Sequence, residues 1–337
     1  MSTFVPPASG STSATAPVVT VFDPYPVLTI TIEDREGADE VHLHAGGQGL
    51  WIGRMAVSLG ATVRLVTATG GEAGVVLLRL IAAEGVDARG ITTLTESAAY
   101  VHDRRSGGRE ELAEVKPPPL SRHELDSLYE RALVESSDAD AFVLAGPRPG
   151  VTVPEGTYRR LAADIGVVQP NVVADLSGEA LEDALAAGTI RVLKLSDEEL
   201  HAAGLTTGSE PDDVMAGICR LHEKGAEDIV VTRGAEPTLA LISDRFMEVR
   251  TPHFTPRDNR GGGDAMTAAL AVGVARADRL DDALRFGAAA GALNVTRRGL
   301  ASVEPEYVRR LAKRVELHPV ELERGRVRSS GSTRRPG

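Results

Sequence analysis

The sequence predicts an α/β protein in which helices cover both faces of a mostly parallel sheet, with a small lid of β-strands. Strand-like and helix-like stretches alternate regularly, which is typical of a parallel sheet with helical crossovers. The alternation breaks between residues 98 and 116. There, the short strand-like stretches 99–103 and 110–115 flank a Ser-Gly-Gly turn, which predicts a hairpin.

The first half of the sequence predicts most of the lid and the start of the sheet. Residues 18–22 and 27–32 are rich in β-branched side chains, and residues 41–45 alternate between apolar side chains and histidines. We therefore predict lid strands within residues 18–45 and 98–116. Between them we expect a helix over 50–59, a strand over 62–68 and a helix over 74–84.

The second half continues the alternation after a run of three prolines. A polar helix over 122–135 comes first, and a hairpin is expected around Ser243. Between these, the expected strands are 141–144, 172–175, 191–195 and 228–232, and the expected helices are 158–165, 181–187 and 212–223.

Composition indicates a soluble enzyme with one large domain. The chain has 337 residues, 42% of them hydrophobic, which is enough for a sizeable core. Residues 1–17 and 321–337 have the composition of disordered tails, the second mostly so, around a domain spanning 18–320. No apolar run approaches the ~20 residues that cross a bilayer, so no membrane association is expected.

Charge and cysteine content exclude other classes. The formal net charge of -11 repels nucleic-acid phosphates, so we expect no nucleic-acid partner. Cys219 is the only cysteine, which rules out a disulfide framework and favours a reducing cytoplasm.

The strongest functional signal is Arg260-Gly261-Gly262-Gly263-Asp264, which runs into an alanine-rich helix. Glycines allow close backbone approach, and amides at a helix N-terminus favour a phosphate. A carboxylate after them can take a proton from an attacking hydroxyl while the amides hold the transferred phosphoryl group. The alternative is a flexible turn followed by an aspartate that only caps the helix.

Two further segments, VVADLSGEAL at 172–181 and VTRGAE at 231–236, extend this signal. Together the three segments resemble those of the PfkB carbohydrate kinases, in particular the branch of 1-phosphofructokinase and tagatose-6-phosphate kinase, over roughly residues 18–317. The resemblance implies a ribokinase-like three-layer sandwich. It also implies ATP-dependent phosphorylation of a hydroxyl on a sugar or sugar phosphate.

The same resemblance implies roles for individual residues. Asp264 would be the general base, and the amides of Gly261, Gly262 and Gly263 the anion hole. Glu199 would help hold hydrated Mg²⁺, with an exposed helix-start carboxylate as the alternative. Asp258 matches a ligand of a monovalent cation such as K⁺, with a plain loop residue as the alternative. The residues matched to the nucleotide site are Lys194, Thr232, Gly234, Arg260 and Ala288; for Ala288, simple helix packing is the alternative.

On the acceptor side the chain departs from the branch pattern, since Asp23-Pro24-Tyr25-Pro26-Val27 lacks the usual final aspartate. Likewise, GGQGLW at 46–51 replaces a pattern with lysine and asparagine. The candidate acceptor contacts are Asp23, Gly46, Gly47, Gln48, Trp51, His102 and Arg105. Trp51 would stack on a ring or pack in the core, and lid arginines would meet an anionic substrate or be solvated.

Other classes are excluded or kept as alternatives. A P-loop motif is absent, and the spacing at 46–49 does not fit a dinucleotide-binding motif. His42 and His44 share one strand face, but no third ligand completes a zinc site. A nucleoside or other small-alcohol kinase of the same fold, and a catalytically silent relative, stay open. The relatives also imply a homodimer formed through the lid.

Overall fold

A ten-stranded sheet is the centre of the computed structural model, which describes residues 15–147, 151, 153–257, 260–297 and 303–321. Its strands lie in the order β16 (Glu316–Pro319), β15 (Arg245–Arg250), β14 (Glu236–Ile242), β13 (Ala226–Arg233), β12 (Ile190–Ser196), β11 (Val172–Asp175), β10 (Ala141–Ala145), β1 (Val18–Phe22), β4 (Thr62–Val66) and β6 (Asp87–Ala88). Pairing is parallel from β13 to β6 and antiparallel from β13 to β16. The predicted mostly parallel sheet is confirmed.

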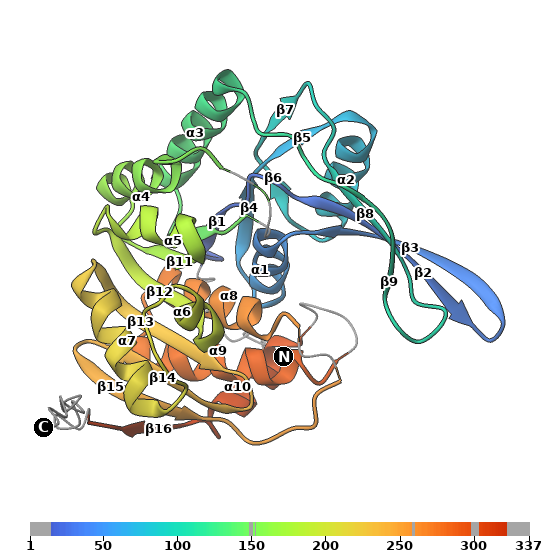
Figure 1. The fold of residues 1–337 in the computed structure, drawn as a ribbon. Helices are drawn as coiled ribbons and strands as arrows, with labels where there is room; N and C mark the ends of the chain where they lie inside the picture. Colours follow the sequence, from blue (N-terminus) through green and yellow to red (C-terminus); the bar gives the residue numbers. More distant parts are fainter. Residues whose placement is uncertain (1–14, 148–150, 152, 258–259, 298–302, 322–337) are drawn as a thin grey trace, which may run out of the picture.

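The central strands are apolar on both faces, because helices cover both (Figure 1). Alternate residues of β1 and β10 enter two separate hydrophobic cores: Val19 and Val143 one, Phe22 and Phe142 the other. The first core is covered by α1 (Gln48–Ser58), α2 (Gly71–Ala83), α8 (Gly262–Ala275), α9 (Leu280–Asn294) and α10 (Pro305–Ala312). The second is covered by α3 (Arg122–Ser137), α4 (Thr157–Val168), α5 (Gly178–Leu185), α6 (Asp197–Ala202) and α7 (Pro211–Glu223).

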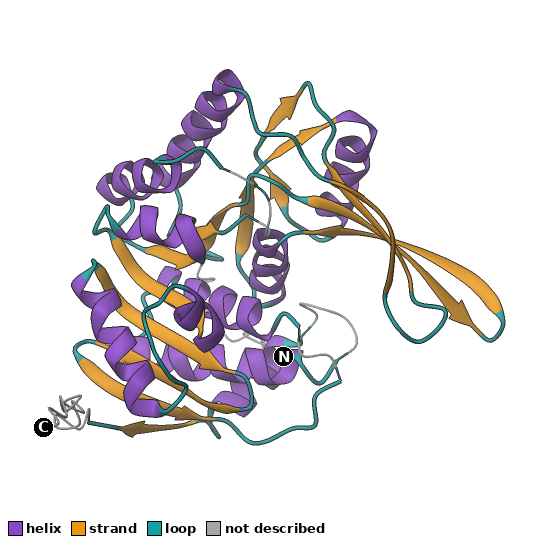
Figure 2. Cartoon of the chain, in the orientation of Figure 1, coloured by secondary structure: helices purple, strands orange, loops and turns teal. Residues whose placement is uncertain are grey.

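The lid is a separate four-stranded sheet that projects from the body (Figure 2). Its order is β3 (Ala38–Gly46), β2 (Val27–Arg35), β8 (Ala98–Asp103) and β9 (Glu110–Val115). A small sheet of β5 (Ala68–Gly70) and β7 (Ile91–Thr93) lies outside both larger sheets. The predicted 98–116 hairpin is confirmed as β8 and β9, which pair antiparallel.

The predicted start of the lid at residue 18 is wrong. β1 lies between β10 and β4 in the central sheet, and Val19 and Val21 are fully buried. β-Branched residues favour any strand, so their presence does not tell a core strand from a lid strand. The lid begins at Val27.

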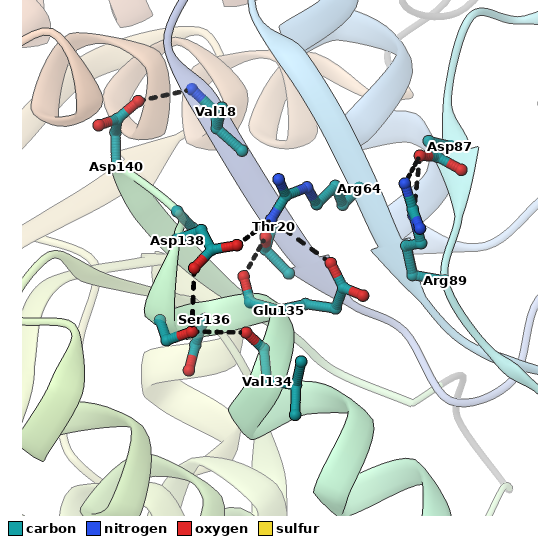
Figure 3. A network of polar contacts seen from close by, with 12 residues as sticks. Val18, Thr20, Arg64, Asp87, Arg89, Val134, Glu135, Ser136, Asp138 and Asp140 are labelled. Atoms are coloured by element: carbon teal, nitrogen blue, oxygen red, sulfur yellow. Dashed lines mark hydrogen bonds and ion pairs between the residues drawn. The ribbon is translucent and has the colours of Figure 1, made fainter.

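A polar network fixes α3 against β1 and β4 (Figure 3). Arg64 of β4 forms an ion pair of 3.4 Å with Glu135, whose side chain is 9% exposed. Thr20 donates from Oγ1 to the carbonyl oxygen of Glu135 over 3.0 Å. Just after α3, Asp140 accepts from the amide of Val18 at 2.7 Å. These contacts fix the position of α3, the helix that connects the lid strand β9 to β10 of the central sheet.

Two further predictions concern the chain ends and membrane association. Residues 1–14 and 322–337, which contain nearly all of the predicted tails, lie outside the described residues. Within the described ranges, none of the helices combines the length and hydropathy of a membrane-spanning segment.

Candidate active site

The glycine-rich turn places Asp264 at the start of α8. Gly261 has φ +70°, a left-handed conformation that favours glycine, and it forms the N-cap. A Cβ at Gly263 would lie 2.6 Å from Nζ of Lys194, and one at Gly262 would lie 3.1 Å from a methyl of Val295. Backbone conformation and close packing therefore require small residues here. Their role as an anion hole remains a prediction.

Beneath this turn, Asp175 and Lys194 form a buried ion pair. Asp175 is the last residue of β11 and Lys194 lies two residues before the end of β12, on the face that α8 covers, where the preceding inward residues Val173 and Val192 are apolar. Nζ of Lys194 lies 3.0 Å from Oδ2 and 3.2 Å from Oδ1 of Asp175. Thr267 of α8 donates from Oγ1 to the same Oδ2 at 2.5 Å. The pair links two strands to the helix that carries Asp264.

The carboxyl of Asp264 is partly buried and close to other charges. Desolvation, and then the negative charge of Asp175, raise its pKa to about 7, while Lys194 and a hydrogen bond from Gln48 oppose the rise. Burial alone would lower the pKa of Lys194, but the carboxylates of Asp175, Asp264 and Glu199 raise it. Lys194 is therefore charged at neutral pH. Asp264, whose pKa lies close to neutral pH, can both accept and release a proton there.

Gln48, the first residue of α1, reaches this centre from the other side. Its Oε1 accepts from the amide of Gly146 at 2.9 Å, and its side chain is one of the groups that hold down the pKa of Asp264. Gly146 follows β10 and was not singled out from the sequence. No local signal marks it, since only the parallel order of β10 and β11 brings it here.

Asp23 and its neighbouring glycines shape the start of α1. Oδ2 of Asp23 accepts from the amide of Gly49 at 3.1 Å, and Oδ1 accepts from the amide of Tyr25 at 3.3 Å. Burial raises the pKa of Asp23 to about 6. Gly47 has φ +125°, and a Cβ there would lie 2.6 Å from Oδ2 of Asp23. The carboxylate thus faces a helix N-terminus, which gives it a structural role beside the predicted acceptor contact.

The other predicted residues of α1 and β3 lie nearby. A Cβ at Gly46, the end of β3, would lie 3.1 Å from Oγ1 of Thr29 in the neighbouring strand. Trp51 is partly exposed, and its amide donates to the carbonyl of Gly47 within the first turn of α1. Their role as acceptor contacts remains a prediction.

Glu199 forms a capping box with Ser196 at the start of α6. Its Oε2 accepts from the amide of Ser196 at 2.8 Å and from its hydroxyl at 3.1 Å, and Ser196 Oγ accepts from the amide of Glu199. The helix-start alternative therefore describes one role of Glu199. Asp258 lies outside the described residues.

The residues predicted to bind the nucleotide do not all have the surroundings of a binding site. Thr232 lies at the end of β13, one strand from Lys194, and Gly234 forms the following turn with φ +58°. Ala288 is 4% exposed inside the core between α8 and α9, so helix packing accounts for it. The carbonyl of Arg260 accepts from Nδ2 of Asn294 in α9 at 3.1 Å.

The lid contributes a polar face on which Tyr100 and His102 lie side by side. Nε2 of His102 lies 3.1 Å from Oγ1 of Thr31, and its Nδ1 is buried with no protein partner among the described residues. Burial and then the charges of Arg109, Arg104 and Arg260 lower the pKa of His102. A neutral histidine thus lies within the field of three arginines.

Arg105 does not join this group. Its guanidinium bonds to both carboxylate oxygens of Asp103 and of Asp39, and these two side chains lie on the opposite face of the lid. Because neighbouring residues of a strand point to opposite faces, the sequence could not decide which arginine faces the site. The lid arginines whose charges act on His102 are Arg104 and Arg109, and Arg109 also lies over the Tyr100 ring.

Comparison with known proteins agrees with this geometry. Residues 27–306 match the model of the pfkB family carbohydrate kinases. The ATP-dependent 6-phosphofructokinase isozyme 2 of Escherichia coli is 30% identical over 75% of this chain and 82% of its own length. The 1-phosphofructokinase of Vibrio cholerae is 26% identical over 82% of this chain and 86% of its own length.

Solved structures show the same architecture. A mutant of phosphofructokinase-2 from Escherichia coli superposes with a TM-score of 0.78 at 25% identity, covering 89% of this chain and 99% of that one. An Arabidopsis thaliana ribokinase, at 21% identity, superposes with a TM-score of 0.69 over 88% of this chain and 99% of that one. The ribokinase-like fold is confirmed.

Proposed function

Because the chain belongs to the PfkB family of carbohydrate kinases, we propose that it transfers the γ-phosphoryl group of ATP to a hydroxyl of a sugar phosphate, with Asp264 as general base. The observation that carries this proposal is the position of Asp264, which lies at the N-terminus of α8 with a pKa raised to about 7. The relatives named above are phosphofructokinases, which favours a sugar phosphate over a nucleoside as the acceptor.

Asp264 performs the proton transfer. Its carboxylate accepts the proton of the acceptor hydroxyl as the hydroxyl oxygen forms a bond to the γ-phosphorus. The bond between that phosphorus and the bridging oxygen breaks, and the electron pair leaves with ADP. A base with a pKa near 7 is ionised in about half of the molecules at neutral pH and holds the proton once it is transferred.

The start of α8 and Lys194 stabilise the charge of the transferred group. Amides of the glycine-rich turn carry the positive end of the helix dipole. Lys194 adds a fixed ammonium just beneath Gly263, held in place by Asp175. Both are present before the substrates bind, so the centre needs little reorganisation during the reaction.

Cations are the second part of the proposal. Within the described ranges, no group of three or more His, Cys, Asp or Glu side chains is arranged to hold a metal ion. This fits Mg²⁺ held mainly by nucleotide phosphates and water, where it supplies charge neutralisation. Ser196 engages only Oε2 of Glu199, so Oε1 would accept from a hydrated Mg²⁺. For K⁺ we propose Asp258; a phosphofructokinase-2 from Escherichia coli has been solved in complex with potassium.

We assign the phosphate of the acceptor to the polar face of the lid. The charges of Arg104, Arg109 and Arg260 all act on His102, and Arg109 lies 4.9 Å from the centre of the Tyr100 ring. Arginine guanidinium groups recognise phosphate oxygens in a bidentate manner. Acceptors without a phosphate group would lack this contact.

The test is ADP release with fructose 1-phosphate, fructose 6-phosphate, tagatose 6-phosphate, free sugars and nucleosides. Asp264→Asn is expected to lose turnover with every acceptor, while Asp244→Asn, an exposed turn residue, keeps it. Turnover with nucleosides alone would contradict the proposed acceptor class. ATP binding without turnover on any acceptor would favour the silent relative.

The outer face of the lid fits a second copy of the chain. Val41, Leu43 and Val115 lie on the face opposite His102 and are between 44% and 58% exposed. Exposed apolar side chains gathered on one sheet face mark an interaction surface. A tetrameric form is known for phosphofructokinase-2 of Escherichia coli. We expect a dimer in sedimentation velocity, and a monomer for Leu43→Asp; a wild-type monomer would contradict this.

The single Cys219 fits the cytoplasm as the proposed location.

A further inference from the structure

Thr267 is a polar side chain in an apolar stretch of helix. Its exposed fraction is 0%, and the rest of α8 from Ala265 to Ala275 consists of alanine, methionine, leucine, valine and glycine. A β-branched residue gains nothing over alanine in a helix, and a buried hydroxyl costs free energy unless it is hydrogen-bonded. The contacts of this hydroxyl therefore decide what Thr267 contributes.

The hydroxyl of Thr267 has two acceptors within reach and one proton to donate. Its Oγ1 lies 2.5 Å from Oδ2 of Asp175 and 3.1 Å from the carbonyl oxygen of Gly263, one helical turn earlier. The carboxylate is the stronger acceptor because it is charged and closer, so Thr267 donates to Asp175. Since Thr267 follows Asp264 by three residues, α8 carries the proposed base and this hydroxyl at neighbouring positions of one face.

The ion pair alone does not fix the plane of the Asp175 carboxylate. Nζ of Lys194 lies 3.0 Å from one carboxylate oxygen and 3.2 Å from the other, and the ammonium can follow the carboxylate if it turns. The terminal torsion of an aspartate is soft, and the ammonium of a lysine sits on a flexible stem. Thr267 adds a contact to Oδ2 from a different element, α8, and this contact removes the freedom.

The ammonium of Lys194 lies directly against the glycine-rich turn. A Cβ at Gly263 would lie 2.6 Å from its Nζ and 3.1 Å from its Cε. A turn of the Asp175 carboxylate would therefore move the positive charge relative to the start of α8, where Gly263 precedes the proposed base.

We infer that Thr267 is a positioning residue for phosphoryl transfer: by holding Oδ2 of Asp175, it fixes the ammonium of Lys194 against the first turn of α8. This inference rests on the proposed function, in which that turn and that ammonium stabilise the transferred group. In this role Thr267 touches neither ATP nor the acceptor, so it acts on kcat rather than on acceptor binding.

The experiment compares Thr267→Val, which removes the hydroxyl at similar volume, with Thr267→Ser, which keeps it. Kinetics use the acceptor identified by ADP release. For Thr267→Val we expect kcat to fall about tenfold to a hundredfold, because a charge placed for the transition state moves by about 1 Å. KM for the acceptor should change less than about threefold. Thr267→Ser should keep kcat close to the wild-type value, and a serine variant as slow as Thr267→Val would overturn the inference.

Thr20→Val is the matched control. Thr20 is also 0% exposed, and its Oγ1 donates to the backbone carbonyl of Glu135 at 3.0 Å. The same substitution there should lower the thermal midpoint but leave kcat unchanged, because this hydrogen bond anchors α3 and not α8. An equal fall in kcat for Thr20→Val and Thr267→Val would leave Thr267 with a structural role only.

Lys194→Gln tests whether Thr267 acts through the ammonium. Glutamine keeps a donor for Asp175 and removes the charge. In this background Thr267→Val should lower kcat by less than about twofold, because no charge is left to position. A second full loss, or a raised acceptor KM with unchanged kcat in Thr267→Val alone, would overturn the inference. Should Thr267→Val fail to fold, Thr267→Ala takes its place with the same expected results.

Crystal structures of Thr267→Val and Thr267→Ser give a readout that needs no turnover. In Thr267→Val we expect the Asp175 carboxylate to be turned and Nζ of Lys194 to be displaced from Gly263 by about 1 Å, whereas Thr267→Ser keeps both positions. An unmoved ammonium contradicts the inference. Loss of turnover in Asp264→Asn together with wild-type kcat in Thr267→Val would keep the proposed function and reject the inference, so the two failures are distinguishable.

Discussion

Nζ of Lys194 lies 3.0 Å from Oδ2 of Asp175, and the two side chains are only 6% and 2% exposed. A buried pair of this kind contributes little compared with an apolar pair, but removal of one partner leaves a buried charge without compensation. The pair therefore matters mainly for the position and charge of what lies above it, namely Gly263 and Asp264.

Lys194→Met should destabilise the fold by about 3–5 kcal/mol, because Asp175 would keep a buried charge whose one remaining side-chain partner among the described residues is Thr267. Urea unfolding followed by circular dichroism measures this loss. Lys116→Met, which removes an exposed lysine that lies 3.9 Å from Glu114, is the matched control and should change stability by less than about 1 kcal/mol. Equal effects of the two substitutions would contradict the role of the buried pair.

Gly263→Ala should lower both stability and turnover. The added Cβ would lie 2.6 Å from Nζ of Lys194, so either the ammonium or the first turn of α8 has to move. Overpacking of this kind costs about 1–3 kcal/mol. Gly108→Ala in the lid turn, where the nearest atom to the new Cβ is 3.7 Å away, is the control. Thermal melts and kcat of both variants check the prediction, which fails if Gly263→Ala behaves like Gly108→Ala.

Asp264→Asn should change how stability depends on pH. The pKa of Asp264 is about 7 in the folded protein and close to 3.8 when it is unperturbed. Between these values the folded state binds the extra proton, so the contribution of Asp264 to stability is present at low pH and is lost as pH rises from about 4 to 7. Asparagine removes this loss.

At pH 8 we therefore expect Asp264→Asn to be more stable than the wild type by about 2 kcal/mol, a figure reduced for the partial exposure of Asp264. At pH 4 the difference should vanish. Guanidinium unfolding at four pH values measures both. A difference that does not depend on pH would mean that Asp264 titrates in the folded state as it does in the unfolded chain.

Arg109→Met should weaken recognition of a phosphorylated acceptor. We expect KM for that acceptor to rise about tenfold, as for the loss of one charged hydrogen bond, with little change for any unphosphorylated acceptor. Arg105→Met is the control, since Asp103 and Asp39 hold its guanidinium on the other face of the lid. Steady-state kinetics with both acceptor types decide this; a larger effect from Arg105→Met would reverse the assignment.

Local sequence features were sufficient to predict the sheet, the 98–116 hairpin and the position of Asp264. The periodicity of apolar residues along a strand or helix is a short-range pattern that can be read from the sequence. Three glycines before an aspartate likewise act locally, because they permit backbone conformations that other residues rarely adopt. The same local reasoning failed for β1, because β-branched residues fit a core strand and a lid strand equally well.

The centre itself depends on residues that lie far apart in the chain. Gln48, Gly146, Asp175, Lys194 and Asp264 come from five elements or their ends, and the sequence around each of them does not tell which of the others it lies beside. Parallel order across β10, β11 and β12 brings three of them to one sheet edge, and α1 and α8 deliver the other two. Periodicity predicts which face of an element is buried, whereas hydrogen-bond partners and pKa shifts follow from distances and desolvation that exist only after the elements have packed.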